Sequence, residues 1–453
     1  MSEKLRFYNT LSRKKEVFKP INKGKVNMFV CGPTVYDYSH LGHAKTYIQF
    51  DFIVRYLRSI GYKVFYLQNI TDIDDRIINR ANEKNLDWKK LKDEYEKFYL
   101  DDMKTLGVVS IDKYARATDY IPEIVSQVKR LIKKGYAYKI SDGWYFDLSK
   151  DKDYGKLARR TDLELNDAVT RIDENKEKRN KGDFCLLKFS RPGEPVWKSD
   201  IGNGRPGWHI EDTAITEKEF GSQYDIHGGG IDLIFPHHEA EIAQMESISG
   251  KKPLVRYWLH TGFLEINNEK MGKSKKNFYT VNEILELGYS SEYIRYFFLS
   301  GHYRKPLNFT FENLDAAKNA YEKLKNILSE FKKSKEKKNK KNIDLAYKQF
   351  VEIVNDDLNM PKALSYLWDI LREDRLNNAE KYELALKFDE VFGLDLGREE
   401  IVSVPAEIKE LISKREASRK AKDFVTADKI REKINKLGFI IEDKEKGFAV
   451  KKR

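Results

Sequence analysis

Apolar and polar positions follow two different periods in the first part of the chain. Residues 26–32 form a short apolar run, residues 44–61 repeat apolar positions at helical spacing and end at Gly61, and residues 62–70 form a second apolar run. A buried strand, an amphipathic helix and another strand in this order are typical of a βαβ unit. The pattern therefore predicts a parallel sheet.

The pattern changes further along the chain. Residues 71–108 and 121–138 have helical spacing, and short strand patterns follow the second helix. Residues 150–203 are polar and rich in Gly and Pro near their end, whereas apolar strand patterns resume at 224–230 and 255–266. We therefore expect an insertion between two halves of one sheet domain.

The last third is mainly helical. From about Asn313 the helical pattern is nearly continuous, and residues 332–341 form a lysine run that is typical of an exposed linker. Residues 407–438 predict two helices, and residues 439–453 predict a hairpin that turns at residues 446–447.

Composition narrows the class of protein. A chain of 453 residues is long enough for about two to four domains. Its net charge of +12 favours a polyanionic partner such as nucleic acid. Cys31 and Cys185 are too few for a disulfide framework. Because no signal-peptide pattern and no apolar run of ~18 residues occurs, we expect a soluble cytoplasmic protein without membrane contact.

The turn after the first predicted strand carries two imidazoles. His40 and His43 flank Leu41 and Gly42 at the predicted start of a helix, where unpaired backbone N–H groups attract phosphate. Gly42 has no side chain to obstruct a nucleotide. The imidazoles can donate hydrogen bonds to phosphoryl oxygens and stabilise the charge that develops when an α-phosphorus is attacked. We predict a phosphate site here.

A second cationic turn lies far along the chain. Lys270 and Lys273 belong to the sequence "KMGKS". Ammonium groups on such a loop would stabilise a departing pyrophosphate, whose charge rises in the transition state. By itself the segment could equally be a polar hairpin tip, but its occurrence with "HLGH" in this order favours nucleotide chemistry.

"HLGH" and "KMGKS" resemble the HIGH and KMSKS signatures of class I aminoacyl-tRNA synthetases, although Gly272 replaces the usual serine. The blocks "MFVCGPTVYD", "NITDIDDRIINRAN", "RPGWHIE", "DIHGGGIDLIFPHHEAEIAQ" and "YFFLSGHYR" resemble the cysteinyl-tRNA synthetase family in particular. The resemblance implies a cysteine–tRNA ligase. Such an enzyme activates L-cysteine with ATP and Mg²⁺ to cysteinyl-adenylate, and then transfers it to the 3′-terminal adenosine of tRNA(Cys). It also implies a monomer.

The resemblance further implies one Zn²⁺ per chain, which would distinguish cysteine from serine by binding sulfur. The family's metal ligands fall on Cys31, Asp212, His237 and Glu241. His237 and Glu241 are four residues apart, so they share one helix face. Asp212 stands where the familiar pattern has a second cysteine. A carboxylate can ligate zinc, but a metal-free pocket in which Asp212 accepts hydrogen bonds is the alternative.

The resemblance also assigns substrate contacts. The implied cysteine-binding residues are Cys31, Thr71, Trp208, Asp232 and His237. The implied ATP-binding residues are Gly42, His227, Gly228, Gly229, Gly230 and Lys273, and the implied catalytic residues are His40, His43, Lys270 and Lys273. Trp208 could equally be a core residue. His238 is about 100° from His237 on a helix, so we expect it to support the site or lie on the surface. Cys185 is expected to be a small hydrophobe.

The resulting fold class is α/β: a Rossmann-type parallel-sheet catalytic domain with an insertion, then an α-helical bundle and a small C-terminal α+β anticodon-binding domain. The expected parts are the first half of the catalytic domain (1–105), the connective insertion (106–203), the second half (204–260), the KMSKS-loop and stem-contact region (261–312), the helical bundle (313–398) and the anticodon-binding domain (399–453).

Two other functions remain open at this level. A cysteine:amino-sugar ligase of the mycothiol type would share the catalytic motifs but would not need the long C-terminal third. That third is long enough to reach from the acceptor end to the anticodon, and its basic side chains at residues 414–422 suit RNA. A non-catalytic tRNA-binding paralogue would not need both histidines and both lysines.

Overall fold

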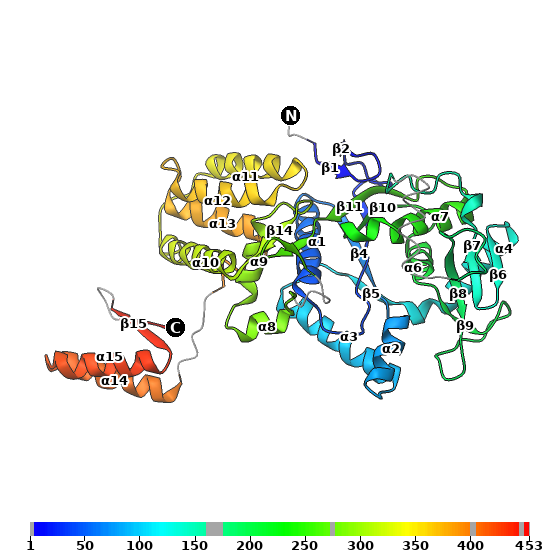
Figure 1. Ribbon diagram of the computed structural model, residues 1–453. Coiled ribbons are helices and arrows are strands. Elements are labelled where there is room, and N and C mark those ends of the chain that lie inside the picture. The colour runs from blue at the N-terminus through cyan, green and yellow to red at the C-terminus, as the bar shows by residue number, and fades with distance from the viewer. Residues whose placement is uncertain (1–3, 160–174, 272–276, 399–404, 444–447, 453) are drawn as a thin grey trace. The chain divides into compact units, whose positions relative to one another are not determined.

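The computed structural model divides into two compact units, residues 1–396 and 397–453 (Figure 1). The residues that it describes are 4–159, 175–271, 277–398, 405–443 and 448–452. Each unit has its own hydrophobic core. Among the described residues, no helix has the combination of length and continuous apolar character that crossing a lipid bilayer requires.

A five-stranded parallel sheet organises the larger unit. Its strands are β3 (Lys25–Val30), β4 (Lys63–Ile70), β5 (Lys113–Arg116), β10 (Tyr224–Gly230) and β11 (Val255–Thr261). The strand order is β11-β10-β3-β4-β5, and every neighbouring pair is parallel. This confirms the predicted Rossmann-type sheet. After β3, strands β4 and β5 are added at one edge of the sheet, and β10 and β11 are added at the other edge. The strand order therefore reverses between β3 and β10. Ligands bind above such a reversal, at the carboxyl ends of the strands.

The predicted βαβ unit is confirmed, with one shift. Helix α1 (Leu41–Ser59) connects β3 to β4 and begins three residues before the expected start. His40 caps it, and Gly61 follows its end with φ 95°, a conformation that favours glycine. The earlier start places both histidines of "HLGH" at the helix N-terminus.

The segment predicted as an insertion contains two kinds of structure. Its first strand, β5, pairs with β4 in the central sheet, so the sheet extends into residues 106–203. Three of its other strands join β9, which lies just beyond residue 203, in a separate antiparallel sheet in the order β6-β7-β8-β9. These strands are β6 (Ala137–Ile140), β7 (Gly143–Phe146), β8 (Phe184–Phe189) and β9 (Gly204–Pro206).

Helices pack around both sheets. Besides α1, the α-helices among the described residues up to position 250 are α2 (Asp75–Glu83), α3 (Trp88–Thr105), α4 (Ile121–Lys133), α6 (Ile210–Phe220) and α7 (His237–Ser249). Short 3₁₀ turns span Ala117–Tyr120, Leu148–Lys150 and Ile231–Ile234. Helices α6 and α7 follow β9 and β10, and both begin near the carboxyl ends of the central strands.

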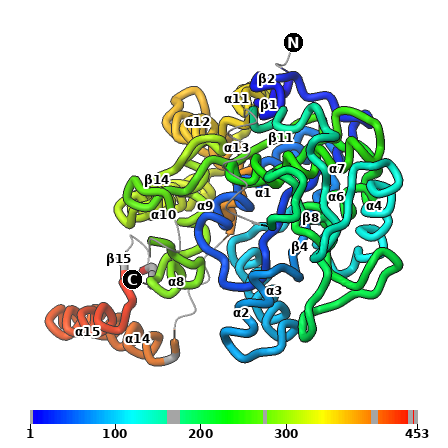
Figure 2. The backbone as a smooth tube through the Cα atoms, turned by 45° about the vertical axis from the view of Figure 1, so that its right-hand side comes forward, coloured from blue at the N-terminus to red at the C-terminus, as the bar shows by residue number. Residues whose placement is uncertain are grey.

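The predicted helical region is confirmed as a bundle. It comprises α10 (Phe311–Phe331), α11 (Lys340–Asn355), α12 (Met360–Arg372) and α13 (Asn378–Phe392), preceded by α8 (Val281–Glu286) and α9 (Ser291–Leu299). The bundle and the β6–β9 sheet lie on opposite sides of the central sheet (Figures 1 and 2). Buried Arg295 joins the bundle to the central sheet domain, because it donates hydrogen bonds to Asp51 of α1 (2.9 Å) and to the Phe392 carbonyl of α13 (3.0 Å).

Small strands complete the larger unit. A hairpin of β1 (Arg6–Asn9) and β2 (Lys14–Val17) precedes the sheet, and β12 (Leu264–Ile266) pairs with β13 (Glu269–Lys270) and β14 (Leu307–Phe309). The second unit contains α14 (Ala406–Lys420), α15 (Phe424–Lys436) and the antiparallel strands β15 (Phe439–Asp443) and β16 (Phe448–Lys452). The predicted two helices and two strands are therefore present, whereas the predicted turn at residues 446–447 lies outside the described residues.

Candidate active site and metal centre

A cavity of about 340 Å³ lies where the central strands end. Its wall includes the turn after β3, the start of α1, and residues that follow β4, β10 and β11. The predicted site residues that line it are Cys31, His40, Gly42, His43, Thr71, Trp208, Asp212, Gly230, Asp232, His237 and Lys270. The parallel sheet thus collects side chains that are far apart in sequence at one edge, as expected for an open α/β sheet.

One end of the cavity holds four potential metal ligands. Asp212 Oδ2 lies 3.4 Å from Cys31 Sγ and 2.9 Å from His237 Nε2, and Glu241 Oε1 lies 3.3 Å from the same His237 nitrogen. One ligand atom from each of these four residues falls within 4.8 Å of the others. The strand end supplies the thiol, α6 supplies the aspartate and α7 supplies the last two ligands. The structure therefore brings the expected ligand set together.

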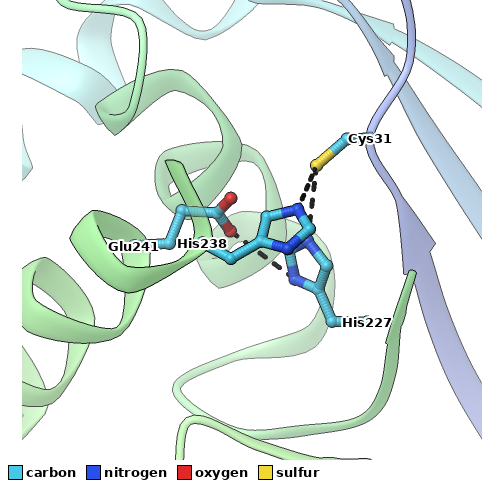
Figure 3. A group of neighbouring side chains, drawn as sticks. All are labelled: Cys31, His227, His238 and Glu241. Carbon is cyan, nitrogen blue, oxygen red and sulfur yellow. Dashed lines mark hydrogen bonds and ion pairs between the residues drawn. The ribbon is translucent and has the colours of Figure 1, made fainter. Parts of the chain in front are cut away.

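A second, overlapping set lies behind the first. Cys31 Sγ is 3.4 Å from His227 Nε2 and 3.2 Å from His238 Nε2, and Glu241 Oε2 is 3.5 Å from His227 Nδ1 (Figure 3). These four residues also satisfy the distances for a metal site. His238 is fully buried, so the expectation that it could lie on the surface is wrong. Helix α7 is buried on almost all sides, and both of its histidines approach Cys31.

His227, Gly228 and Gly229 do not line the cavity, contrary to the ATP contacts expected for them. His227 is buried between Trp258, on which it stacks, and the Tyr224 hydroxyl at 2.6 Å. A Cβ atom on Gly228 would lie only 2.4 Å from the ring of Phe50. Gly228 therefore allows α1 to pack closely on β10. Of the "HGGG" sequence, Gly230 alone reaches the cavity wall.

The metal cluster concentrates acidic groups in a buried place. Asp212 Oδ1 and Glu211 Oε2 have no hydrogen-bond partner among the described residues, and the Glu241 oxygens, although they approach the two histidine nitrogens, form no hydrogen bond there either. Burial, followed by the charges of Asp212 and Glu211, raises the pKa of Glu241. Burial and the neighbouring carboxylates likewise raise the pKa of the Cys31 thiol. A divalent cation would offset this repulsion and favour the thiolate, so the donor set suits a metal ion.

Three of the four residues of the first ligand set line the cavity, whereas only Cys31 of the second set does. Cys31, Asp212 and His237 line the cavity, but His227 and His238 do not. His209 Nδ1 lies 2.8 Å from His237 Nδ1, which leaves His237 Nε2 toward the carboxylates. A partner on the second ring nitrogen is the usual way to orient a metal-binding histidine. Trp208 stacks on His237 with 4.4 Å between ring centroids, so it belongs to the cavity wall and not to a hydrophobic core.

Two other predicted contacts reach the cavity near this end. The Thr71 hydroxyl donates to Glu211 Oε1, which holds the threonine at the wall. Asp232, in the 3₁₀ turn after β10, also lines the cavity.

The opposite end of the cavity is built on the N-terminus of α1. His40 Nδ1 accepts a hydrogen bond from the His43 backbone N–H at 3.3 Å, and His43 Nδ1 accepts one from the His40 N–H at 3.5 Å. The two rings stack at 3.8 Å. Because each Nδ1 accepts, each neutral ring carries its proton on Nε2. This reciprocal cap fixes the tautomer that can donate to a phosphoryl oxygen.

The hairpin that carries Lys270 is joined to this helix end. A Cβ on Gly42 would lie 2.6 Å from the terminal methyl of the Met271 side chain, so a larger residue there would require the flexible methionine to move. The segment after the "KMGKS" sequence returns to the helix, where the Leu41 N–H donates to the Tyr279 carbonyl at 2.9 Å. Lys273 and Gly272 lie outside the described residues.

Lys45 ties α1 to the wall that leads into the same hairpin. Its Nζ donates to the Gly262 carbonyl at 2.6 Å, and the neighbouring hydroxyl of Thr46 lies 3.0 Å from that of Thr261. Lys45 is 1% exposed, and this burial lowers its pKa to about 7.

Comparisons with known proteins agree with this geometry. Residues 17–319 match the family described as the tRNA synthetases class I (C) catalytic domain, and residues 402–450 match the cysteinyl-tRNA ligase anticodon binding domain. The cysteine–tRNA ligase of Thermococcus gammatolerans is 45% identical over 99% of this chain and 99% of its own. The chain belongs to the cysteinyl-tRNA synthetase family. The cysteine–tRNA ligase of Thermoplasma acidophilum is 46% identical over 97% of this chain and 98% of its own.

Solved structures show the same fold. Methionyl-tRNA synthetase of Mycobacterium tuberculosis bound by methionyl-adenylate covers 82% of this chain and 90% of its own, with a TM-score of 0.59 and 15% identity. Agrobacterium radiobacter LeuRS, in a ternary complex with tRNA, covers 84% of this chain and 85% of its own, with a TM-score of 0.59 and 10% identity. The resemblance to class I synthetases and the predicted fold class are confirmed.

Three residues of the site were not predicted from the sequence. His209 orients His237, and Glu211 accepts a hydrogen bond from Thr71. His260 Nε2 shares a hydrogen bond with His238 Nδ1 at 2.8 Å. His209 and Glu211 are sequence neighbours of the predicted site residues Trp208 and Asp212 in "GWHIED". This proximity was the only indication in the sequence that they could belong to the site. For His260, near the end of the apolar strand β11, the sequence offered no signal.

Proposed function

We propose that the chain charges tRNA(Cys) with L-cysteine in two steps. L-Cysteine and MgATP react to give cysteinyl-adenylate and pyrophosphate, and the cysteinyl group then passes to the 3′-terminal adenosine of the tRNA. The observation that supports this most strongly is one cavity with a thiol and carboxylate cluster at one end and the His40–His43 pair at the other. Such a cavity suits a substrate with a thiol next to a reacting nucleotide.

The metal in this proposal is one Zn²⁺ per chain, held by Cys31, Asp212, His237 and Glu241. When bound, it would supply an open coordination position for the substrate's sulfur, which distinguishes cysteine from serine. The chain's own residues prepare that position. His209 directs His237 Nε2 toward the carboxylates, and Trp208 covers the imidazole from the cavity side.

The phosphate end acts through hydrogen bonds. The Nε2–H groups of His40 and His43 donate to the α-phosphoryl oxygens of ATP as the cysteine carboxylate attacks. Lys270 and Lys273 stabilise the pyrophosphate as it leaves. Thr71 and Asp232 bind the amino acid, and Gly42 and Gly230 leave room for the nucleotide.

The RNA-binding part of the proposal rests on the C-terminal third. The match to an anticodon binding domain at residues 402–450 supports anticodon contact by the second unit. The amino-sugar ligase that the motifs left open would have no use for such a domain. We propose a cytoplasmic location, since the chain has only two cysteines and so needs no oxidising compartment. The resemblance to the family supports a monomer.

Two assays test this function. Cysteine-dependent exchange between ATP and pyrophosphate measures activation, and attachment of cysteine to tRNA(Cys) measures the complete reaction. We expect both with zinc-loaded protein. Exchange without tRNA charging would contradict the ligase and favour an amino-sugar acceptor, whereas loss of both would favour a non-catalytic RNA-binding protein.

One substitution tests the second lysine of "KMGKS". Lys273→Ala should reduce pyrophosphate exchange by about 10²-fold, because the leaving group loses a cation, while the affinity for cysteine stays unchanged. An unchanged exchange rate would remove Lys273 from the catalytic set.

A further inference from the structure

The active-site cavity offers few cations for the anionic groups of its substrates. Among the described residues that line it, Arg76 and Lys270 are the only arginine and lysine. Lys270 acts on pyrophosphate in the proposed reaction, whereas Arg76 has no assigned role. The same wall includes the carboxylates of Asp212 and Asp232. A substrate carboxylate that enters this cavity therefore needs a cation near it, and Arg76 is the one whose task is open.

The Arg76 side chain is held in place on two sides. Asp74, which caps α2, accepts hydrogen bonds from the Arg76 backbone N–H and from its Nε, both at 2.8 Å. The Arg76 Nη2 donates to the Thr34 hydroxyl at 2.8 Å. Within the described parts of the chain, Nη1 makes no hydrogen bond, and the side chain is 45% exposed. A guanidinium fixed in this way can donate to a ligand without first being ordered.

Two aromatic rings place the guanidinium beside the thiol end of the cavity. It lies 5.5 Å from the ring centroid of Tyr36 and 5.6 Å from that of Trp208. Contacts of this kind favour a cation over the face of a ring. Trp208 in turn stacks on His237, with 4.4 Å between the ring centroids. Arg76 is therefore separated from a proposed metal ligand by a single ring.

Arg76 is also close to the phosphate end. A smaller cavity of about 160 Å³ is lined by Arg76 together with His40 and His43. Arg76 thus lies near both the metal centre and the two imidazoles. In L-cysteine only two carbon atoms separate the sulfur from the carboxyl carbon, so a thiol bound at the metal centre leaves the carboxylate a short distance away. The carboxylate must also face the α-phosphorus, which the imidazoles contact in the proposed reaction.

We propose that Arg76 binds the carboxylate of L-cysteine and holds it between the metal centre and the His40–His43 pair. The inference rests on the proposed function, because it assigns a residue to the substrate of that reaction. Arg76 would be a substrate-binding residue beside the predicted contacts of Thr71, Trp208 and Asp232.

The free nitrogen of Arg76 suits this role chemically. Nη1 donates to one carboxylate oxygen, and the other oxygen attacks the α-phosphorus. That oxygen forms the new P–O bond while the bond to pyrophosphate breaks, and the guanidinium keeps its protons throughout. Because the carboxylate loses its charge when the anhydride forms, Arg76 binds L-cysteine more strongly than cysteinyl-adenylate. The main effect of Arg76 is therefore on the affinity for cysteine.

A ligand without the carboxylate tests this assignment. Cysteamine keeps the thiol and the ammonium group of L-cysteine but lacks the carboxylate. The dissociation constants of both ligands are measured with zinc-loaded protein at one pH, and the ratio of cysteamine to L-cysteine is compared between variants. For the wild-type protein we expect L-cysteine to bind about 10- to 100-fold more tightly, the size of a charge-assisted hydrogen bond.

Two arginines of the same helix provide the variant and its matched control. Arg76→Gln should reduce the ratio about 10-fold, because L-cysteine loses a cation that cysteamine never used. Arg80→Gln should keep the wild-type ratio, since Arg80 pairs with Glu83 at 3.2 Å and Asp37 at 3.8 Å and lines neither cavity. A purely structural disturbance would weaken both ligands alike and leave the ratio unchanged.

A wild-type ratio in Arg76→Gln would overturn the inference. Arg76→Met, which keeps an unbranched side chain beside Trp208, gives the same test if the glutamine variant does not fold. An unchanged ratio together with a loss of tRNA charging would place Arg76 at the RNA instead, and so would also overturn it. These results refute this inference alone, whereas a wild-type protein without cysteine-dependent pyrophosphate exchange would refute the proposed function.

Discussion

The two ends of the active-site cavity differ in burial, and the difference follows their chemistry. At the thiol end, Cys31, Asp212, His237 and Glu241 are all at most 5% exposed and come from three elements packed in the core. At the phosphate end, the His40 and His43 side chains are half-buried and Lys270 is exposed. A coordination site requires fixed ligands without competing water, whereas a site for a leaving group requires access and charge.

Removing the Cys31 thiol should cause the largest loss of zinc binding and activity. Cys31→Ala deletes the only sulfur ligand, so the metal content should fall from about one zinc per chain to well below that. Pyrophosphate exchange should fall by about 10³-fold, equivalent to about 4 kcal/mol of transition-state stabilisation. Cys185→Ser is the matched control because Cys185 is not part of either metal cluster. Zinc retention by Cys31→Ala would contradict the ligand assignment.

The phosphate end should lose activity without losing its fold. His40→Asn retains a side chain that caps helices well but removes the imidazole. We expect pyrophosphate exchange to fall by about 10²-fold, while zinc content, cysteine affinity and melting temperature remain close to wild type. Full activity of this variant would show that His40 serves only as a helix cap.

A smaller effect should follow when the support of His237 is removed. His209→Phe preserves an aromatic ring but removes the Nδ1 that lies 2.8 Å from His237 Nδ1. The affinity for zinc, measured by competition with a chelator, should fall by about 10- to 100-fold. His209→Asn, whose amide can replace Nδ1, should lose less. Equal affinities for the two variants would exclude orientation of His237 as the role of His209.

The buried Lys45 predicts a dependence on pH. Its pKa is about 7 in the folded chain but about 10.4 when unfolded. Between these values the unfolded state binds a proton that the folded state lacks, so Lys45 makes the stability rise with pH, by at most about 1.4 kcal/mol per pH unit. The free energy of unfolding of wild type relative to Lys45→Met should therefore increase from pH 7 to pH 9 in urea titrations. A constant difference would contradict the lowered pKa.

Hydrophobic period predicted the first βαβ unit of the site, but it did not predict α6, which carries Asp212. The β3–α1–β4 unit has long apolar runs, so the sequence predicted the bounds of its three elements to within about three residues. The strand β5, with the sequence "KYAR", has no apolar run and was included in the insertion. It becomes a strand because β4 offers it an open edge with which to pair.

The placement of the histidines could not be predicted in the same way. The spacing of His237 and Glu241 fixed their common helix face, and they do meet near Asp212. The rotation of about 100° between His237 and His238 was also predicted correctly. It would place His238 on the protein surface only if one face of α7 were exposed. Because α7 is buried all around, His238 meets Cys31 from another side. Burial of His227 under Trp258 likewise depends on tertiary packing.

The most direct test of the central claim counts sulfur atoms around the bound zinc. In this chain Cys31 is the single protein sulfur of the proposed ligand set, because Asp212 occupies the position of a second cysteine. X-ray absorption at the zinc edge should show one sulfur ligand in the free protein, two with L-cysteine and one with L-serine. An unchanged sulfur count on adding L-cysteine would contradict recognition by direct coordination.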